Sequence, residues 1–474
     1  MNEKTKKLLS NTMIFTVGKF ISKIIVFLML PLYTSCLTNA EYSTADLIAN
    51  LCNLIIPMAA LGVSEGIFRA AADKNDDKEA FLTNGIFIMM LGCAAFLARS
   101  PLLTLWKTFT PYVWLIVLYV LASNIHSVCS QYVCAIGKSK LFAFQGILNT
   151  AITVVLNIIF LLGIGLGVEG YVLSIILADL LSALFVFFVA KLYLAIKPRK
   201  ISRDIIKSLL KFCLPLVPST VFWWITGVSD RYMVSAICSP EENGLYAVAY
   251  KIPTLLTYVV IIFNDAWKIS AVSDADDMDK NAKFYSSTYK LYQAIMFIGG
   301  GFICIFSWIF ARILFAESFR AAWIFVPVLT VATVFSSLDT FLGSAYFTVR
   351  KTGMSLLTSF IGAAINIALN IMLIKPYGAM GASIATLASY LLVYVIRAAT
   401  MKKFIPFKTY PVRVLLNTAL VGGMAAIITL KGMNLVSIGM SLVLLIICIL
   451  YNGRDLYSAI RGILAPLMRR FKKI

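Results

Sequence analysis

The sequence predicts an all-α polytopic membrane protein with about 14 transmembrane helices, and three observations lead to this class. Hydrophobic residues make up 60% of the 474 residues and charged residues only 14%. The mean hydropathy is +0.88. Apolar runs of about 20 residues, long enough to cross a bilayer as helices, recur along the chain. A soluble domain of this length does not need so apolar a surface.

The apolar runs are separated by short polar segments, none of which is long enough to be a soluble domain. The first run follows a basic segment and is too long for a signal peptide, which predicts a retained first helix. The runs cover residues 11–34, 43–68, 80–98, 111–136, 140–164, 169–190, 212–237, 244–267, 284–311, 321–348, 353–374, 379–397, 411–430 and 433–452.

The basic residues are distributed unevenly between the two sides of the predicted membrane. With the N-terminus inside, 31 of the 42 Lys and Arg residues fall in cytoplasmic segments and six fall in outer ones. The positive-inside rule therefore predicts a multi-pass protein of the cell membrane (plasma or inner membrane) with both termini cytoplasmic. This distribution accounts for the net charge of +20 without a nucleic-acid partner.

Two cytoplasmic segments have amphipathic patterns. In the connection 191–211, apolar residues recur at helical spacing among seven basic residues, which predicts a link lying partly in the membrane plane. The tail after Gly453 combines an apolar face with six basic residues. Such a segment favours contact with anionic membrane lipids.

An internal repeat divides the chain into two halves. TNAEYSTADL at 38–47 resembles SPEENGLYAV at 239–248, with Glu41 aligned on Glu242. The second match pairs LNIIFLLGIGLGVEG with LNIMLIKPYGAMG; they cover residues 156–170 and 369–381. Both matches are displaced by six helices, and an even displacement preserves orientation in the membrane.

The repeat predicts two pseudo-symmetric six-helix lobes around a central cavity, followed by two further helices. The expected divisions are 1–195 for the first lobe, 196–405 for the second, and 406–474 for the last two helices and the basic tail. A cavity between parallel halves is a place where charged side chains inside a membrane stay hydrated.

Charged residues inside the predicted spans are the candidate functional residues. Lys19 and Lys23 lie four residues apart on one face of the first span, with Lys23 near the midplane. Arg231 and Lys251 lie at similar depths in two neighbouring spans, beside Asp230. These four cations against one acid predict a cationic lumen with an anionic guest, and arginine suits phosphate in particular.

Each candidate also has a structural interpretation. Lys19 and Lys23 could snorkel toward the cytoplasm, and Asp230 could pin two helices by pairing with Lys251 or Arg231. The other acids in the spans are candidates for ion coupling or for paired contacts between helices. They are Asp179, Asp265, Asp339 and, near an inner end, Glu65.

Cysteine and histidine give no sign of a metal centre. The nine cysteines are scattered without metal-ligand spacing, and His126 is the single histidine. The sequence predicts no cofactor and no catalytic residue, and leaves H⁺ or Na⁺ open as a coupling ion.

At this point the sequence resembles the Wzx-type flippases of O-antigen and capsule repeat units. These form the polysaccharide transporter branch of the MOP superfamily, which also holds the MATE transporters. The matching stretches are VGKFISKIIVFLMLPLYTSCLTNAEYSTADL at 17–47, ALGVSEGIFR at 60–69, SDRYMVSAICSPEENGLYAVAYKI at 229–252 and GAMGASIATLASY at 378–390.

The resemblance implies a transporter rather than an enzyme. It implies alternating access that moves an undecaprenyl-pyrophosphate-linked oligosaccharide from the cytoplasmic to the outer leaflet, with polysaccharide polymerase or assembly proteins as partners. The family's cationic cavity carries over by position onto Lys23, Arg231 and Lys251. The two additional helices are similar to those of lipid II flippases.

Three alternatives stay open. A lipid II-type flippase moves a chemically similar guest. A MATE-like drug or cation antiporter favours an acidic cavity, opposite in sign to the one predicted here. A membrane-integral glycan polymerase typically needs a large outer loop that carries catalytic residues, and the predicted outer loops are short.

Overall fold

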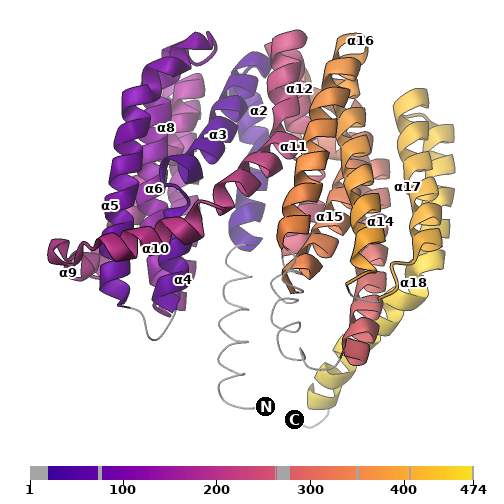
Figure 1. Ribbon diagram of the computed structural model, residues 1–474. Helices are drawn as coiled ribbons and strands as arrows, with labels where there is room; N and C mark the ends of the chain where they lie inside the picture. Colours follow the sequence, from indigo (N-terminus) through magenta and orange to yellow (C-terminus); the bar gives the residue numbers. More distant parts are fainter. Residues whose placement is uncertain are drawn as a thin grey trace. The chain divides into compact units, whose positions relative to one another are not determined.

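A computed structural model describes residues 20–72, 77–261, 263, 278–348, 352–404 and 407–471, and every regular element in these ranges is helical (Figure 1). Within these ranges, ten helices are long and apolar enough to cross a membrane, and up to 12 spans result if each of two bent pairs counts as one. The all-α polytopic class is therefore confirmed, while the count of 14 stays a prediction.

The chain divides into two compact units, unit 1 at Met1–Val228 and unit 2 at Ser229–Ile474. The division falls inside one helix, α11 (Leu216–Ile237). The boundaries expected from the sequence at 195/196 and 405/406 stay predictions.

Unit 1 begins with an apolar helix at Phe20–Cys36, whose last part is α2. Its helices are α2 (Leu30–Cys36), α3 (Asn39–Ala59), α4 (Val63–Ala72), α5 (Lys78–Arg99), η1 (Ser100–Leu105), η2 (Thr110–Tyr112), α6 (Val113–Ala135), α7 (Ser139–Asn157), the π-helical η3 (Ile158–Ile164), α8 (Gly167–Val189), α9 (Leu192–Ala195), η4 (Pro198–Lys200) and α10 (Arg203–Cys213).

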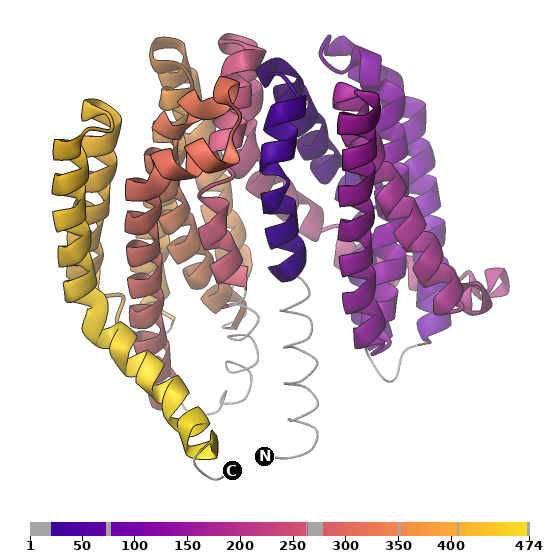
Figure 2. The same cartoon turned by 180° about the vertical axis from the view of Figure 1, so that it is seen from behind.

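The helices of unit 2 are α12 (Pro240–Ala249), a short helix at Thr254–Ile261, α14 (Met278–Leu314), η5 (Glu317–Ile324), α15 (Val326–Thr348), α16 (Thr352–Met401), α17 (Pro411–Lys431) and α18 (Leu435–Phe471). The last helix of unit 2, α18 (yellow), extends beyond α17 (Figure 2).

One predicted span in each unit is broken. In unit 1, α3 and α4 meet at a bend of 58°, and Leu61 there has a φ of +51°. In unit 2, α12 and the helix Thr254–Ile261 meet at a bend of 43°. A break frees backbone groups that a continuous helix would pair, so such breaks are found where the backbone is buried or lines a cavity.

In each unit, the two repeated motifs, one with the acidic residue and one with the glycine turn, contact each other. In unit 1, a Cβ on Gly167 would lie 3.3 Å from Glu41 Oε1. In unit 2, Ala379 N–H donates to Glu242 Oε1 at 2.6 Å, beside Gly378. Both glycines have positive φ, +57° and +58°. The acidic residue that starts the second helix of each half therefore meets the glycine turn that starts the sixth.

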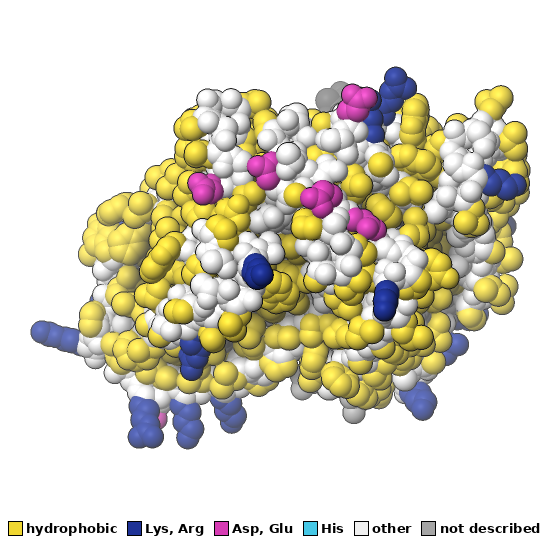
Figure 3. Space-filling view, turned by 90° about the horizontal axis from the view of Figure 1, so that it is seen from above, with side chains coloured by type: hydrophobic (Ala, Val, Ile, Leu, Met, Phe, Trp, Pro, Cys, Tyr) yellow, Lys and Arg dark blue, Asp and Glu magenta, His cyan; other side chains and the backbone are white. Residues whose placement is uncertain are grey.

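Side-chain caps explain why α3 and α12 begin where they do. Thr38 and Glu41 form a reciprocal capping box on α3, and Ser239 Oγ accepts from Glu242 N–H at 3.1 Å on α12. Carboxylate side chains, magenta in Figure 3, are exposed on the face of the molecule that is seen from above.

The helix α16 consists of two helices that join at Gly378, where φ is +58° and ψ is −142°. It therefore carries two of the predicted spans, 353–374 and 379–397. Pro376, shortly before this break, also disfavours a continuous helix.

Candidate functional site

Clusters of buried and partly buried polar side chains lie inside the spanning helices of both units, and two of them contain residues that the sequence singled out. The Asp179 cluster of unit 1 joins α6, α7 and α8 and consists of Ser123, His126, Ser130, Gln145, Asn149 and Asp179. The Asp230 cluster of unit 2 joins α11, α16 and the broken span and consists of Asp230, Arg231, Tyr246, Tyr250, Lys251 and Thr386.

The Asp179 carboxylate is held from three side chains. His126 Nδ1 lies 3.1 Å from Asp179 Oδ1, and Asn149 Nδ2 donates to the same oxygen at 2.9 Å. The Ser123 hydroxyl donates to Oδ2. The His126 and Asp179 side chains are 19% and 12% exposed, so the charge is compensated locally rather than by bulk water.

Both ring nitrogens of His126 have neighbours at hydrogen-bonding distance. Its Nδ1 faces the Asp179 carboxylate, and its Nε2 lies 2.7 Å from Gln145 Oε1. The Gln145 amide nitrogen is directed the other way and donates to Ser130 Oγ at 2.8 Å. Both ring nitrogens thus face acceptors, and an imidazole donates to both only when it carries two protons.

The Asp230 carboxylate is fully buried and accepts hydrogen bonds from Tyr246, Thr386 and the Arg231 backbone. The Tyr246 hydroxyl donates to Oδ2 at 2.5 Å and Thr386 Oγ1 donates to the same oxygen at 3.0 Å. The Arg231 backbone N–H donates to Oδ1 at 2.8 Å. These bonds join α11, α12 and the second half of α16, so Asp230 stabilises the contact of three helices.

Arg231 lies against the broken span of unit 2. Its side chain is 7% exposed, and the guanidinium carbon lies 4.9 Å from the centre of the Tyr250 ring. Lys251 follows Tyr250 in the turn at 250–253, is partly exposed, and its carbonyl accepts from Thr254 Oγ1. The structure therefore brings the predicted residues Asp230, Arg231 and Lys251 into one region.

The other sequence candidates lie elsewhere. Lys23 is exposed on the helix Phe20–Cys36, and Glu65 is exposed in the first turn of α4. Lys19 and Asp265 lie outside the described residues. Asp339 belongs to a third cluster, in which it lies 3.2 Å from Arg397 Nε.

Arg397 joins the two halves of α16 to α15. It donates to Thr358 Oγ1 at 2.9 Å and to Ser359 Oγ at 3.0 Å, in addition to its ion pair with Asp339. Arg397 is the last residue of the predicted span 379–397, and it is only 6% exposed. Because this ion pair is buried, loss of either partner would leave an uncompensated charge and strongly destabilise the fold.

A fourth cluster ties α17 and α18 to α14. Lys290 Nζ lies 2.8 Å from Asp455 Oδ1, and Arg413 Nη1 pairs with the other Asp455 oxygen. Arg413 also donates twice to Asn452 Oδ1.

The chain is similar to proteins of glycan biosynthesis. Residues 8–267, more than half of the chain, match the model of a family described as polysaccharide biosynthesis protein. An uncharacterised membrane protein of Methanocaldococcus jannaschii is 23% identical over 302 residues, which cover 59% of this chain and 68% of that protein. The probable low-salt glycan biosynthesis flippase Agl15 of Haloferax volcanii is 22% identical over 208 residues, or 43% of each protein.

Solved structures share the fold. An outward-facing multidrug resistance MATE family transporter of the MOP superfamily aligns with a TM-score of 0.61 at 16% identity, over 84% of this chain and 95% of that one. A MOP superfamily transporter from Pyrococcus furiosus, described as having a binding pocket of reverse polarity, aligns with a TM-score of 0.58 at 15% identity, over 83% and 96%. At this identity the likeness establishes the fold alone.

Proposed function

The chain belongs to the polysaccharide biosynthesis protein family and has the fold of MOP superfamily transporters, and from this we propose that it flips an undecaprenyl-pyrophosphate-linked oligosaccharide from the cytoplasmic to the outer leaflet. The family and the fold together indicate a multi-pass membrane transporter of the flippase type. The lipid-linked glycan is the cargo that fits this family and a cationic site.

One observation carries the proposal of a diphosphate cargo: Arg231 lies against Tyr250 at the break in a spanning helix, and Lys251 is the next residue of the same turn. Substrate sites in transporters are typically formed at such discontinuous helices. An arginine there offers a planar fork of donors that matches phosphate oxygens. Tyr250 holds the guanidinium of Arg231 by a cation–π contact.

The proposed mechanism is alternating access, in which the diphosphate and glycan occupy the cationic site while the prenyl tail stays in lipid. We propose H⁺ as the coupling ion, bound at His126 and Asp179. Of the acids considered for coupling, Asp179 faces a histidine whose two nitrogens both meet acceptors. Na⁺ remains the alternative ion.

The proposed location is the cell membrane, with both termini cytoplasmic, as the basic residues predict. The proposed partners are the enzymes that polymerise or assemble the delivered glycan. A lipid II-type flippase is the nearest alternative, since its guest also carries a prenyl diphosphate. A drug antiporter is disfavoured because Arg231 and Lys251 are cations, and a MATE-like fold at 16% identity does not decide the cargo.

The test is depletion of the protein in its host, followed by measurement of the lipid-linked oligosaccharide in each leaflet. We expect build-up on the cytoplasmic face, reversed by the wild type. Arg231→Ala should reduce transport about tenfold or more, because it removes charge-assisted hydrogen bonds to the diphosphate. Absence of any build-up on depletion would overturn the proposed cargo and favour the antiporter.

The matched control is Arg312→Ala. The guanidinium carbon of Arg312 lies 5.2 Å from the centre of the Trp308 ring, which is also a cation–π contact. Unlike Arg231, Arg312 is exposed at the end of α14. It should transport at the wild-type rate. Arg231→Lys keeps the charge and loses the fork, so an intermediate rate is expected. The amount of each variant in the membrane is measured in parallel. Equal amounts show that a lower transport rate is not caused by a lower amount of protein.

A further inference from the structure

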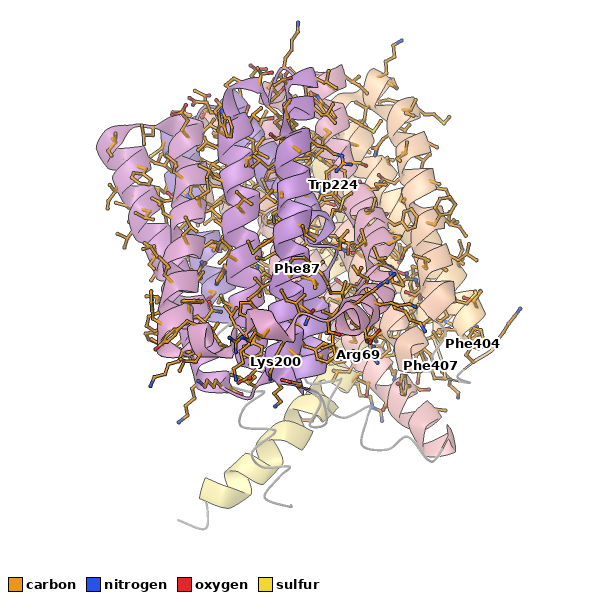
Figure 4. All side chains as sticks on the ribbon, turned by 60° about the vertical axis from the view of Figure 1, so that its left-hand side comes forward. Arg69, Phe87, Lys200, Trp224, Phe404 and Phe407 are labelled. Atoms are coloured by element: carbon orange, nitrogen blue, oxygen red, sulfur yellow. The ribbon has the colours of Figure 1, made fainter. Side chains whose placement is uncertain are left out.

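A cavity of about 430 Å³ lies between α4, α5 and α10 in unit 1, and no residue of the Asp179 cluster lines it. Figure 1 shows α10 lying across α4 and α5 near their lower ends, and Figure 4 shows Arg69 and Lys200 at this level of the unit. Ligand sites for small molecules have volumes of about 300–1,000 Å³. The cavity is lined by Gly66, Arg69, Ala70, Phe81, Ser208, Leu209, Lys211 and Phe212.

The position of α10 depends on close packing against α4. A Cβ on Gly66 would lie 2.6 Å from Cys213 Sγ and 2.9 Å from Leu209 Cδ2. Leu209 and Cys213 are 2% and 0% exposed. The apolar face of α10 is therefore fixed on α4 and α5, which leaves its polar residues at the rim of the cavity.

The wall of the cavity carries two cations and a hydroxyl group. The guanidinium carbon of Arg69 lies 4.3 Å from the centre of the Phe212 ring, so the aromatic ring holds the guanidinium at the wall. Lys211 and Ser208 come from α10 and are exposed. Among the residues that the structure describes, the side chains of Arg69, Lys211 and Ser208 form no ion pair or hydrogen bond.

The carboxylates near this end of α5 are bound to other cations. Lys200 Nζ lies 2.7 Å from Asp77 Oδ2 and 3.1 Å from Glu79 Oε2, and Lys197 Nζ lies 2.6 Å from the same Glu79 oxygen. The bond from Lys200 holds the pKa of Asp77 below its ordinary value. No carboxylate lines the described cavity, so its charge is positive.

We propose that this cavity binds the phosphate group of an anionic membrane lipid. Arginine, lysine and serine offer the donors that phosphate oxygens accept, and basic pockets between transmembrane helices bind lipid head groups. Apolar side chains flank the site along the chain, because Ile201 and Leu214 are 44% and 47% exposed. An acyl chain covers such side chains, whereas free phosphate does not. The proposal is independent of the cargo.

The experiment titrates the delipidated full-length protein in detergent with dioleoyl-phosphatidylglycerol, and native mass spectrometry counts the bound lipid. The test variant is Arg69→Gln with Lys211→Gln. The matched control is Arg203→Gln with Lys207→Gln, which removes the same charge from exposed positions of α10 outside the cavity. Separate arms use inorganic phosphate as competitor and the single variant Lys211→Gln, while thermal unfolding checks that each variant is folded.

We expect the first lipid to bind about thirtyfold more weakly to the test variant than to the wild type, since each basic side chain near an anionic lipid contributes about a fivefold factor. The control should stay close to wild type, and Lys211→Gln should fall between the two. Equal weakening in both double variants, or in neither, would overturn the site. Displacement of the lipid by equimolar inorganic phosphate would overturn a lipid as its ligand.

Discussion

At the scale of the residue, His126 is the side chain whose surroundings change its interpretation most. As a lone histidine in an apolar span, it had no metal partners in the sequence. In the fold it lies between the Asp179 carboxylate and the Gln145 amide oxygen. The remaining hydrogen-bonding groups of the cluster, on Ser123, Asn149 and Ser130, do not titrate. Tyr119 is a further titratable side chain near Asp179, and Cys52 and Tyr171 lie near Tyr119.

The substitution His126→Gln should remove the pH dependence of transport. Histidine changes charge between about pH 5 and 8, a window in which an ordinary carboxyl, tyrosine or thiol changes little. Transport into proteoliposomes, measured between about pH 5.5 and 7.5, should therefore vary several-fold in the wild type and remain nearly flat in the variant. Ser130→Ala, which shortens the same network without removing a titratable group, should keep the wild-type profile. A wild-type profile in His126→Gln would contradict H⁺ coupling at this site.

The sequence located the buried charges but not the partners that reach them from helices distant in the chain. Asp179, Asp230 and Asp339 were recognisable because an acid inside an apolar run is costly unless it is paired. Their partners come from other helices: His126 from α6, Thr386 from the second half of α16, and Arg397 from the same half-helix. Sequence spacing specifies neighbours within one helix, and the packing of different helices is decided by the whole fold.

At the scale of the element, the glycine turns show how far a repeat can be read. The sequence aligned Glu41 on Glu242 and the glycine motif at 167–170 on that at 378–381. The structure adds that the two members of each half touch each other. Hydropathy also places the spans well, but it does not reveal the bends in the second and eighth spans. At the first break Ala60, Leu61 and Gly62 are as apolar as the helices, and at the second break Lys251 was interpreted as a charge inside a span.

The substitution Gly378→Ala should destabilise unit 2. Its φ of +58° with ψ of −142° lies in a region that side chains disfavour, and its Cβ would lie 2.2 Å from Glu242 Oε1. A cost of about 1–3 kcal/mol is expected for such a backbone conformation, seen as a lower melting temperature in detergent. Gly353→Ala in the first turn of α16, where a Cβ meets nothing within 4 Å, should melt like the wild type. Equal melting temperatures for the two variants would show that the turn relaxes without strain.

At the scale of the whole molecule, the uneven distribution of basic residues determines the predicted orientation. In a cysteine-free background, Lys431→Cys at the end of α17 and Arg320→Cys in η5 should react with a membrane-impermeant maleimide in intact cells. Lys140→Cys at the start of α7 should react only after the membrane is opened. All three native side chains are exposed, so access is set by the membrane. The reverse labelling pattern would invert the topology.

The cluster of Lys290, Arg413 and Asp455 connects the last two helices to the rest of unit 2. Lys290 lies in the spanning part of α14, and its carboxylate partner comes from α18. About three turns further along α14, Gly301 contacts residues of both α17 and α18, since its Cβ would lie 3.3 Å from Met424 Sδ and 3.0 Å from Leu445 Cδ1. A protein shortened to the first 12 predicted spans would present the Lys290 ammonium group and Gly301 to lipid. We therefore expect that removal of the final two helices destabilises the rest of unit 2.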